Sequence, residues 1–153
     1  MTLVELLKPE LILTNASCAS KDDLINSIIK KIYSSGLELP IAQDKLLQII
    51  MKREQIGGTL LPSGLSVPHA RLKDYEGFII ALGTAKEPIF FDGIQLRLMA
   101  LMISSQSGGE HYLPAVAVLT KISRDTEFLS NLGKAENTES FISLLEEKDR
   151  QLM

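Results

Sequence analysis

Residues 53–72 read Arg-Glu-Gln-Ile-Gly-Gly-Thr-Leu-Leu-Pro-Ser-Gly-Leu-Ser-Val-Pro-His-Ala-Arg-Leu, and the interpretation of the whole chain starts from this stretch. Its glycines and prolines indicate irregular backbone rather than the interior of a helix or strand. His69, one of two histidines in the sequence, directly follows Pro68. Because proline fixes its own φ and biases the preceding residue towards extended geometry, the imidazole is carried on backbone with little freedom. The pattern predicts a positioned nucleophile on a loop.

The same stretch resembles a known family. Arg53-Glu54, Gly58-Thr59 and Val67-Pro68-His69-Ala70 match, in this order, the enzyme IIA proteins of the bacterial phosphoenolpyruvate-dependent phosphotransferase system, in the fructose/mannitol/nitrogen-regulatory (type 2) branch. In that family the histidine of the Pro-His motif takes a phosphoryl group from a small phosphocarrier, HPr or its nitrogen-branch relative NPr, and passes it on. The resemblance covers nearly the whole chain and implies that His69 is the phosphoacceptor.

Length and composition indicate one ordinary globular domain, residues 1–153, with 45% hydrophobic and 23% charged residues. A net charge of −3 and a pI near 5.4 argue against nucleic-acid binding and fit a basic protein partner more easily. No apolar run is long enough to span a bilayer, and the amino terminus lacks the pattern of a secretory signal. We therefore expect a cytoplasmic protein without direct membrane insertion.

The hydrophobic pattern predicts an α/β domain with a sheet flanked by helices. Expected helices start at Ser20, Pro40, His111, Thr126 and Asn137 or Thr138, and expected strands span 11–13, 78–84 and 96–103. The strand 78–84 is almost continuously apolar, so it should be buried on both faces, and 96–103 is expected to be a second central strand. Asp92-Gly93 predicts a turn, residues 104–110 a loop, and residues 146–153 a frayed tail. The family resemblance implies a mixed sheet rather than a purely parallel one, in an enzyme IIA type-2-like domain.

A neutral imidazole can attack phosphorus directly, and the reference pKa of histidine leaves it largely neutral near pH 7. The transferred group then needs positioning and charge neutralisation. Arg53, expected at a helix end, is the first candidate for this role and Thr59 the second. Arg71 is closer to His69 in sequence, but its direction cannot be read from the pattern. Glu54 is expected to orient Arg53 through a charge-assisted hydrogen bond.

His111 follows His69 by 42 positions and is expected at a helix amino terminus, whose free N–H groups favour an anion. Members of the family commonly have a second histidine there, which implies that His111 assists at the site; the alternative is an ordinary helix-start residue. The chain departs from the family nearby. It has Ser104-Ser105 where Ala-Pro is usual, and His111-Tyr112-Leu113 where His-Leu is usual.

Other chemistry lacks the residues that it needs. Two histidines and the single Cys18 are a poor zinc set, so no metal is expected, and no cofactor is needed for transfer between histidines. Neither a Gly-x-Ser-x-Gly motif nor a phosphate-binding P-loop is present, which leaves serine hydrolysis and nucleotide-dependent kinase chemistry without an anchor.

The favoured function is phosphotransfer: His69 accepts a phosphoryl group from HPr or NPr and donates it to an enzyme IIB domain in sugar uptake. One alternative is a regulator of the nitrogen branch, in which phosphorylation controls binding to a target protein. A second is a degenerate domain that accepts no phosphate. A shuttle has to dock its partners, and Leu60, Leu61 and Leu65 are candidates for an exposed apolar rim or, alternatively, for core residues.

Overall fold

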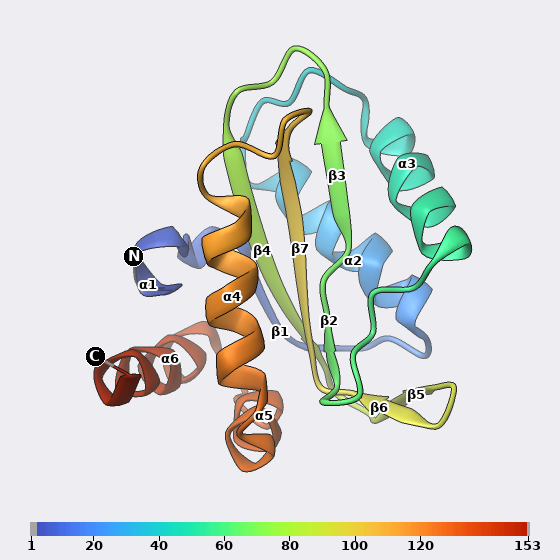
Figure 1. The fold of residues 1–153 in the computed structure, drawn as a ribbon. Coiled ribbons are helices and arrows are strands. Elements are labelled where there is room, and N and C mark those ends of the chain that lie inside the picture. Colours follow the sequence, from blue (N-terminus) through green and yellow to red (C-terminus); the bar gives the residue numbers. More distant parts are fainter. Residues whose placement is uncertain (1–2, 153) are drawn as a thin grey trace.

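Strand β7 (Leu98–Ser105) lies inside a five-stranded mixed sheet and organises the fold (Figure 1). On one side it pairs antiparallel with β4 (Phe78–Ala85), which pairs in parallel with β1 (Ile12–Ala16) at the edge. On its other side β7 pairs in parallel with β2 (Leu65–Ser66) and then with β3 (His69–Leu72). The computed structural model describes residues 3–152. The predicted α/β class with a mixed sheet is confirmed.

The continuous apolar runs are explained by helices on both faces of the sheet. Along β7, Met99, Leu101 and Ile103 pack into one hydrophobic cluster, whereas Leu98, Ala100 and Met102 pack into another. This alternation is the period of two of an extended chain. Both sets are fully or almost fully buried, which confirms β7 as a central strand, although it spans Leu98–Ser105 rather than 96–103. β4 is buried from Ile79 to Thr84, on both faces, as predicted.

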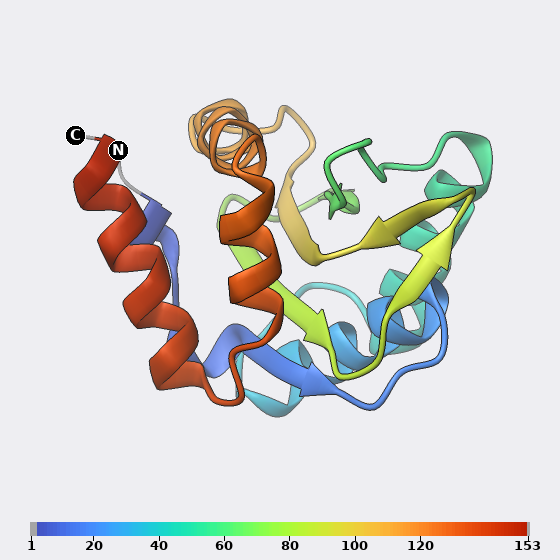
Figure 2. The same cartoon turned by 90° about the horizontal axis from the view of Figure 1, so that it is seen from below.

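Two groups of helices cover the two faces (Figures 1 and 2). One cluster includes α2 (Lys21–Ser34) and α3 (Gln43–Ile56). The other includes α4 (Tyr112–Ser123), α5 (Thr126–Gly133) and α6 (Thr138–Leu152). A short helix α1 (Leu3–Leu6) packs on α6, and a 3-10 turn, η1 (Pro9–Leu11), leads into β1. The chain therefore forms a helix–sheet–helix sandwich.

A hairpin of β5 (Ile89–Phe91) and β6 (Ile94–Leu96) extends beyond the main sheet. Its turn is the predicted Asp92-Gly93 pair, and both residues have positive φ. Two-residue hairpin turns favour this backbone because its twist matches that of the strands.

Side-chain caps set several helix starts. Ser20 accepts a hydrogen bond from Asp23 N, Asp125 from Phe128 N, and Asn137 from Ser140 N. Each bond satisfies a backbone N–H that the first helical turn leaves free, and each confirms a predicted start to within one residue. α3 is the exception: it begins at Gln43 rather than at Pro40.

The predicted fraying of the tail is wrong for residues 146–152. α6 continues to Leu152, and its buried Asp149 accepts a hydrogen bond from Val4 N through Oδ2. Leu152 packs against the core as well. This contact between the two ends of the chain stabilises the last turns; Met153 lies outside the described residues.

His69 is not on an irregular loop, as the glycines and prolines predicted, but is the first residue of β3. Its partner in β7 is Met102, and Pro68 O accepts a hydrogen bond from Met102 N. β2 and β3 are two and four residues long, too short to produce a recognisable alternation. Residues 69–72 therefore form a strand because they pair with β7.

Gly64 turns the chain into β2 in a conformation that suits only glycine. Its φ is +96°, and an added Cβ would lie 2.7 Å from Gln95 O. We expect Gly64→Ala to lower the free energy of unfolding by about 1–3 kcal/mol, from backbone strain and this clash. Urea unfolding measures the change. Gly57→Ala is the control, because Gly57 has extended backbone and open space around its Cα, and should shift stability by less than about 0.5 kcal/mol. Equal effects would contradict the assignment of strain to Gly64.

Candidate active site

A cleft of about 710 Å³ lies at the β3 edge of the sheet, beside the last turns of α3. Three segments line it: the end of α3, the loop that follows, and β3. The lining residues are Ile49, Lys52, Arg53, Ile56, Gly57, Gly58, Thr59, His69 and Arg71. Three cations and no carboxylate are in this set. The cleft thus brings together His69, Arg53 and Thr59, as predicted, and has the charge that suits an anion.

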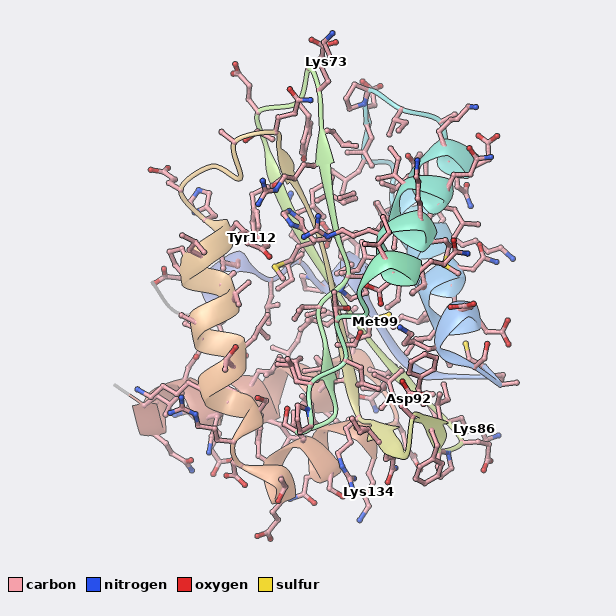
Figure 3. The ribbon with its side chains drawn as sticks, turned by 45° about the vertical axis from the view of Figure 1, so that its right-hand side comes forward. Lys73, Lys86, Asp92, Met99, Tyr112 and Lys134 are labelled. Carbon is pink, nitrogen blue, oxygen red and sulfur yellow. The ribbon has the colours of Figure 1, made fainter. Side chains whose placement is uncertain are left out.

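His69 is 2% exposed, and its ring is held from two sides. Its Nε2 lies 2.8 Å from Ser104 Oγ. The ring of Tyr112, which lies in the first turn of α4 (Figure 3), stacks on it with centroids 4.1 Å apart and planes inclined by 13°. Nδ1 is buried and has no hydrogen-bond partner among residues 3–152. Tyr112 covers one face of the ring. The nitrogen lone pair lies in the ring plane, so this stacking does not cover it.

The pKa of His69 is lowered to about 4. Burial is the largest cause, and the positive charges of Arg71 and Arg53 add to it. Both effects disfavour an imidazolium ion. At neutral pH His69 is therefore uncharged and keeps a nucleophilic lone pair.

Arg71 belongs to this arrangement, although its direction could not be read from the sequence. It stands two residues after His69 in β3, so both side chains project from the same face of the strand. Its side chain is exposed and lines the cleft, as does Arg53 at the end of α3. Two guanidinium groups thus stand near one imidazole.

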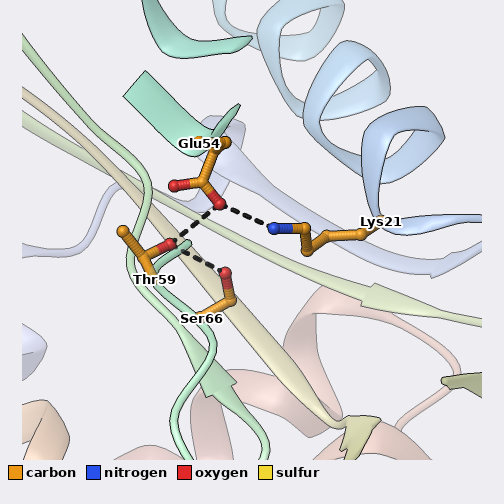
Figure 4. Close-up of polar contacts among 4 residues, drawn as sticks. All are labelled: Lys21, Glu54, Thr59 and Ser66. Atoms are coloured by element: carbon orange, nitrogen blue, oxygen red, sulfur yellow. Dashed lines mark hydrogen bonds and ion pairs between the residues drawn. The ribbon is translucent and has the colours of Figure 1, made fainter. Parts of the chain in front are cut away.

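Glu54 does not orient Arg53, so that prediction is wrong. Its Oε1 lies 2.9 Å from Lys21 Nζ and accepts a hydrogen bond from Thr59 Oγ1 at 3.1 Å (Figure 4). Thr59 Oγ1 also lies 3.2 Å from Ser66 Oγ. A buried cation explains the difference, because it attracts the carboxylate of Glu54 inward while Arg53 remains exposed. Thr59 therefore lines the cleft and also connects the loop after α3 to Ser66 of β2.

His111 is the N-cap residue of α4, as predicted from the sequence. Its Nε2 lies 3.5 Å from Glu110 Oε1, and its ring centroid lies 5.9 Å from that of Phe78. The residue after it, Tyr112, makes the ring contact with His69. A role for His111 at the site stays a prediction.

Leu60, Leu61 and Leu65 do not form an exposed rim. Leu65 is fully buried, and the other two are partly buried against the two hydrophobic clusters. The alternative prediction, that these leucines are core residues, is confirmed. Ile49 and Ile56, on the cleft side of α3, are exposed instead, by 38% and 83%.

Reasoning from the sequence missed the contributions of Ser104 and Tyr112 to the site. Both coincide with departures from the family pattern, and that was the only signal available. Ser104 is separated from His69 by 35 positions, and only the pairing of β3 with β7 brings the two together.

The described residues contain no cluster of three or more potential metal-ligating His, Cys, Asp or Glu side chains. None of the helices within 3–152 is long and apolar enough to cross a bilayer.

Comparison with known proteins identifies the family. The profile described as "Phosphoenolpyruvate-dependent sugar phosphotransferase system, EIIA 2" matches residues 5–148. The chain belongs to this EIIA type 2 family. Its members act as phosphotransferase components through a phosphohistidine, and the present EIIA protein is such a component.

Relatives of this EIIA chain include two kinds of protein. A nitrogen regulatory protein of Bradyrhizobium diazoefficiens is 24% identical, over 95% of each chain. The 2-O-alpha-mannosyl-D-glycerate-specific EIIABC component of Escherichia coli is also 24% identical, over 97% of this chain, which spans about a quarter (23%) of that protein. Both regulatory and sugar-specific members of the family are therefore similar to this chain.

Solved structures share the fold. Nitrogen regulatory protein IIA-Ntr from Neisseria meningitidis superposes with a TM-score of 0.73 at 18% identity, covering 94% of this chain and 98% of the other. IIA mannitol from Escherichia coli gives 0.70 at 19% identity, covering 91% and 98%. A complex of IIA mannitol with phosphorylated IIB mannitol from the same organism gives 0.68 at 20% identity, covering 92% and 97%.

The lowered pKa of His69 predicts a pH-dependent stability. The unfolded chain binds a proton below its pKa of about 6.5, whereas the folded protein does so only near pH 4. The contribution of His69 to the free energy of unfolding is therefore fully present above pH 6.5. It is lost as the pH falls towards 4, and the loss reaches about 3 kcal/mol. Urea unfolding of wild type and His69→Gln across this window measures it. The difference between the two proteins should change with pH; parallel curves would contradict the lowered pKa.

The Lys21–Glu54 pair predicts a strong effect of removing one charge. Both side chains are 4% exposed, so Lys21→Met leaves a buried carboxylate without its cation and should lower stability by about 3–5 kcal/mol. Lys148→Met is a matched control. Lys148 pairs with Asp125 at 2.7 Å and lies over Phe128, much as Lys21 lies over Phe91, but the side chain of Asp125 is 44% exposed. Its loss should be at most about 1 kcal/mol. Similar losses in denaturant unfolding would show that burial does not decide the effect.

Proposed function

We propose that His69 is the phosphoacceptor of this EIIA protein and that it takes its phosphoryl group from an HPr-type carrier, HPr or NPr. The observation that supports this is an uncharged imidazole at a cleft with two guanidinium groups. A neutral nitrogen supplies the electron pair, and the arginines offset the charge of the incoming group. No cofactor takes part.

The transfer is an in-line displacement. A ring nitrogen of His69 forms a bond to phosphorus while the P–N bond of the carrier breaks, and the carrier's ring leaves with the electron pair of that bond. Arg53 and Arg71 interact with the phosphoryl oxygens, whose charge the transition state spreads over three positions. The positive groups that lower the pKa of His69 thus also stabilise the reacting phosphoryl group.

Thr59 and His111 complete the proposed site. Thr59 lines the cleft and holds its loop through Glu54 and Ser66. His111 starts α4, whose first turn also carries Tyr112, so both histidines are linked to the same helix terminus. We assign His111 a supporting contact to the bound phosphoryl group.

The onward acceptor is an enzyme IIB domain, and the reaction takes place in the cytoplasm, where phosphoenolpyruvate is available. Ile49 and Ile56 provide the exposed apolar surface beside the cleft on which carrier and acceptor dock in turn. A related IIA mannitol in complex with phosphorylated IIB mannitol supports this choice of partner. Nucleic acid and direct membrane insertion have no part in the proposal.

A regulatory role is the second candidate. The nitrogen regulatory relative covers 95% of both chains, whereas the sugar-specific EIIABC relatives are about four times as long as the matched region. In this role the phosphorylation state of His69 changes the affinity of the protein for a target protein.

Phosphorylation at His69 is tested by supplying phosphoenolpyruvate, enzyme I and HPr or NPr. We expect wild type to gain one acid-labile, base-stable phosphate and His69→Ala to gain none. Arg53→Met should slow the reaction by about 100-fold, since a donor aimed at developing charge is removed. Lys30→Met, an exposed cation on α2, is the control and should react at the wild-type rate. Phosphate on His69→Ala would move the acceptor elsewhere.

The two candidate roles differ in the fate of the phosphate. A sugar-transport component should lose its label to a matching IIB domain within seconds of mixing, because its role is to pass the phosphoryl group on. A regulator should keep the label and bind a target in only one phosphorylation state. Radiolabel transfer and a pull-down with both forms distinguish these outcomes. An unlabelled wild-type protein under all these conditions would favour the degenerate domain.

A further inference from the structure

Neither ring nitrogen of His69 is free to bind a phosphoryl group in this structure. Nε2 lies 2.8 Å from Ser104 Oγ, and Nδ1 is buried without a hydrogen-bond partner in the described part of the chain. Although the residue lines the cleft, it is only 2% exposed. A phosphoryl group brings a phosphorus atom and three oxygens to the nitrogen that it binds, and this space is absent around the ring. The ring is therefore retracted from the cleft.

The cleft beside the ring has the space that the retracted position lacks. It measures about 710 Å³, and the exposed side chains of Arg53 and Arg71 line it. Rotation about the Cα–Cβ bond of His69 moves the imidazole without a change in the backbone, and two rotamers about this bond are common in β-strands. An extended position in the cleft brings the ring nitrogens close to these cations.

Two contacts hold the ring in the retracted position. In the pairing of β3 with β7, Ser104 stands opposite Arg71 and projects from the same face as His69. Ser104 is 1% exposed, so water does not compete for its hydrogen bond with the ring. Tyr112 packs on one face of the ring, with centroids 4.1 Å apart, and aromatic stacks of this kind are favourable. Both residues lie in the segments where this chain departs from the family pattern.

We propose that Ser104 and Tyr112 are positioning residues that hold His69 in a retracted position, and that the ring swings into the cleft to receive the phosphoryl group. The second part rests on the proposed function. In the extended position a ring nitrogen forms the bond to phosphorus as the carrier's P–N bond breaks, and the carrier's ring leaves with the electron pair of that bond. Only the molecules with an extended ring are competent at any time, and the two contacts set this fraction.

Chemical modification tests the first part without any phosphate. Diethyl pyrocarbonate transfers an ethoxycarbonyl group to an uncharged imidazole nitrogen, and mass spectrometry of peptides follows each histidine separately. His111, whose side chain is 41% exposed, is the reference within the same molecule. The pKa of about 4 leaves His69 uncharged at pH 7, so a slow reaction reports a lack of access. We expect wild-type His69 to react about 10-fold or more slowly than His111, as for a minor extended state.

Removing either contact should raise the ratio of the His69 rate to the His111 rate. We expect increases of about 2- to 10-fold in Ser104→Ala, which loses a hydrogen bond, and in Tyr112→Leu, which loses the ring stack. Tyr112→Phe keeps the ring and should restore the wild-type ratio. All ratios are measured without denaturant, on variants that urea curves show to be folded. Equal rates for the two histidines in wild type overturn the proposal, and an unchanged ratio in either variant removes that residue from it.

Ser123→Ala is the matched control for Ser104→Ala. Ser123 is also buried, and it donates a hydrogen bond to Thr120 O at 2.8 Å, but it lies at the other end of α4 from Tyr112. Its loss should leave the ratio of the two rates at the wild-type value. A ratio that rises as much as in Ser104→Ala would show that any buried serine has this effect and would overturn the role of Ser104.

The rate of phosphorylation tests the second part. With phosphorylated HPr as the donor in single-turnover reactions, Ser104→Ala and Tyr112→Leu should be labelled about 2- to 10-fold faster than wild type, because a larger fraction of their molecules has an extended ring. Ser123→Ala should react at the wild-type rate. An unchanged or slower reaction in both variants would contradict the swing of the ring. If wild type gains no phosphate at all, the proposed function fails, whereas the modification rates still decide whether His69 is retracted.

Discussion

The ion pair between Lys21 and Glu54 connects the parts of the chain that form the cleft. Lys21 is the first residue of α2, and Glu54 is in the last turn of α3. The same carboxylate accepts a hydrogen bond from Thr59, which in turn contacts Ser66 of β2. Two charges removed from water are costly unless they are paired, so the folded state keeps these elements in one arrangement. Arg53 is bonded directly to Glu54 in sequence, and its position at the cleft depends on that arrangement.

The cleft meets two requirements of a phosphoryl acceptor. A nucleophilic histidine has to be neutral, and a site for a phosphoryl group has to be positive. Burial is the main cause of the neutral ring, and Arg71 and Arg53 add to both requirements, because their charge opposes protonation of the ring and attracts the anion. Burial under Tyr112 strengthens each effect by lowering the local dielectric constant. In the proposed reaction, phosphorylation of His69 replaces a neutral ring by an anionic group among cations.

The surface around this cleft differs from the one inferred from the leucines of residues 60–65. A loop that follows a helix and re-enters a sheet buries its apolar side chains on both sides of that sheet, and Leu60 and Leu61 illustrate this by contacting different clusters. The exposed apolar residues come from the outer side of α3 instead. A docking surface on a helix is rigid, which suits the proposed docking of a carrier and an acceptor in turn.

Local patterns were sufficient for much of the fold. The cap at Ser20 and the Asp92-Gly93 turn depend on interactions within a few residues, and the uninterrupted apolar runs mark β4 and β7 as buried strands, so the sequence by itself determined these elements. The Arg-Glu, Gly-Thr and Pro-His motifs likewise identified the segment that lines the cleft.

The contacts around His69 depend on residues far apart in the chain, and only the tertiary structure decided them. β3 becomes a strand because β7 pairs with it, and this pairing brings Ser104 to His69 and fixes the face from which Arg71 projects. Glu54 binds Lys21 rather than Arg53, because the packing of α2 on α3 places a buried cation within 2.9 Å of its carboxylate. Sequence spacing carries no information about such distances, since long-range pairing and burial set them.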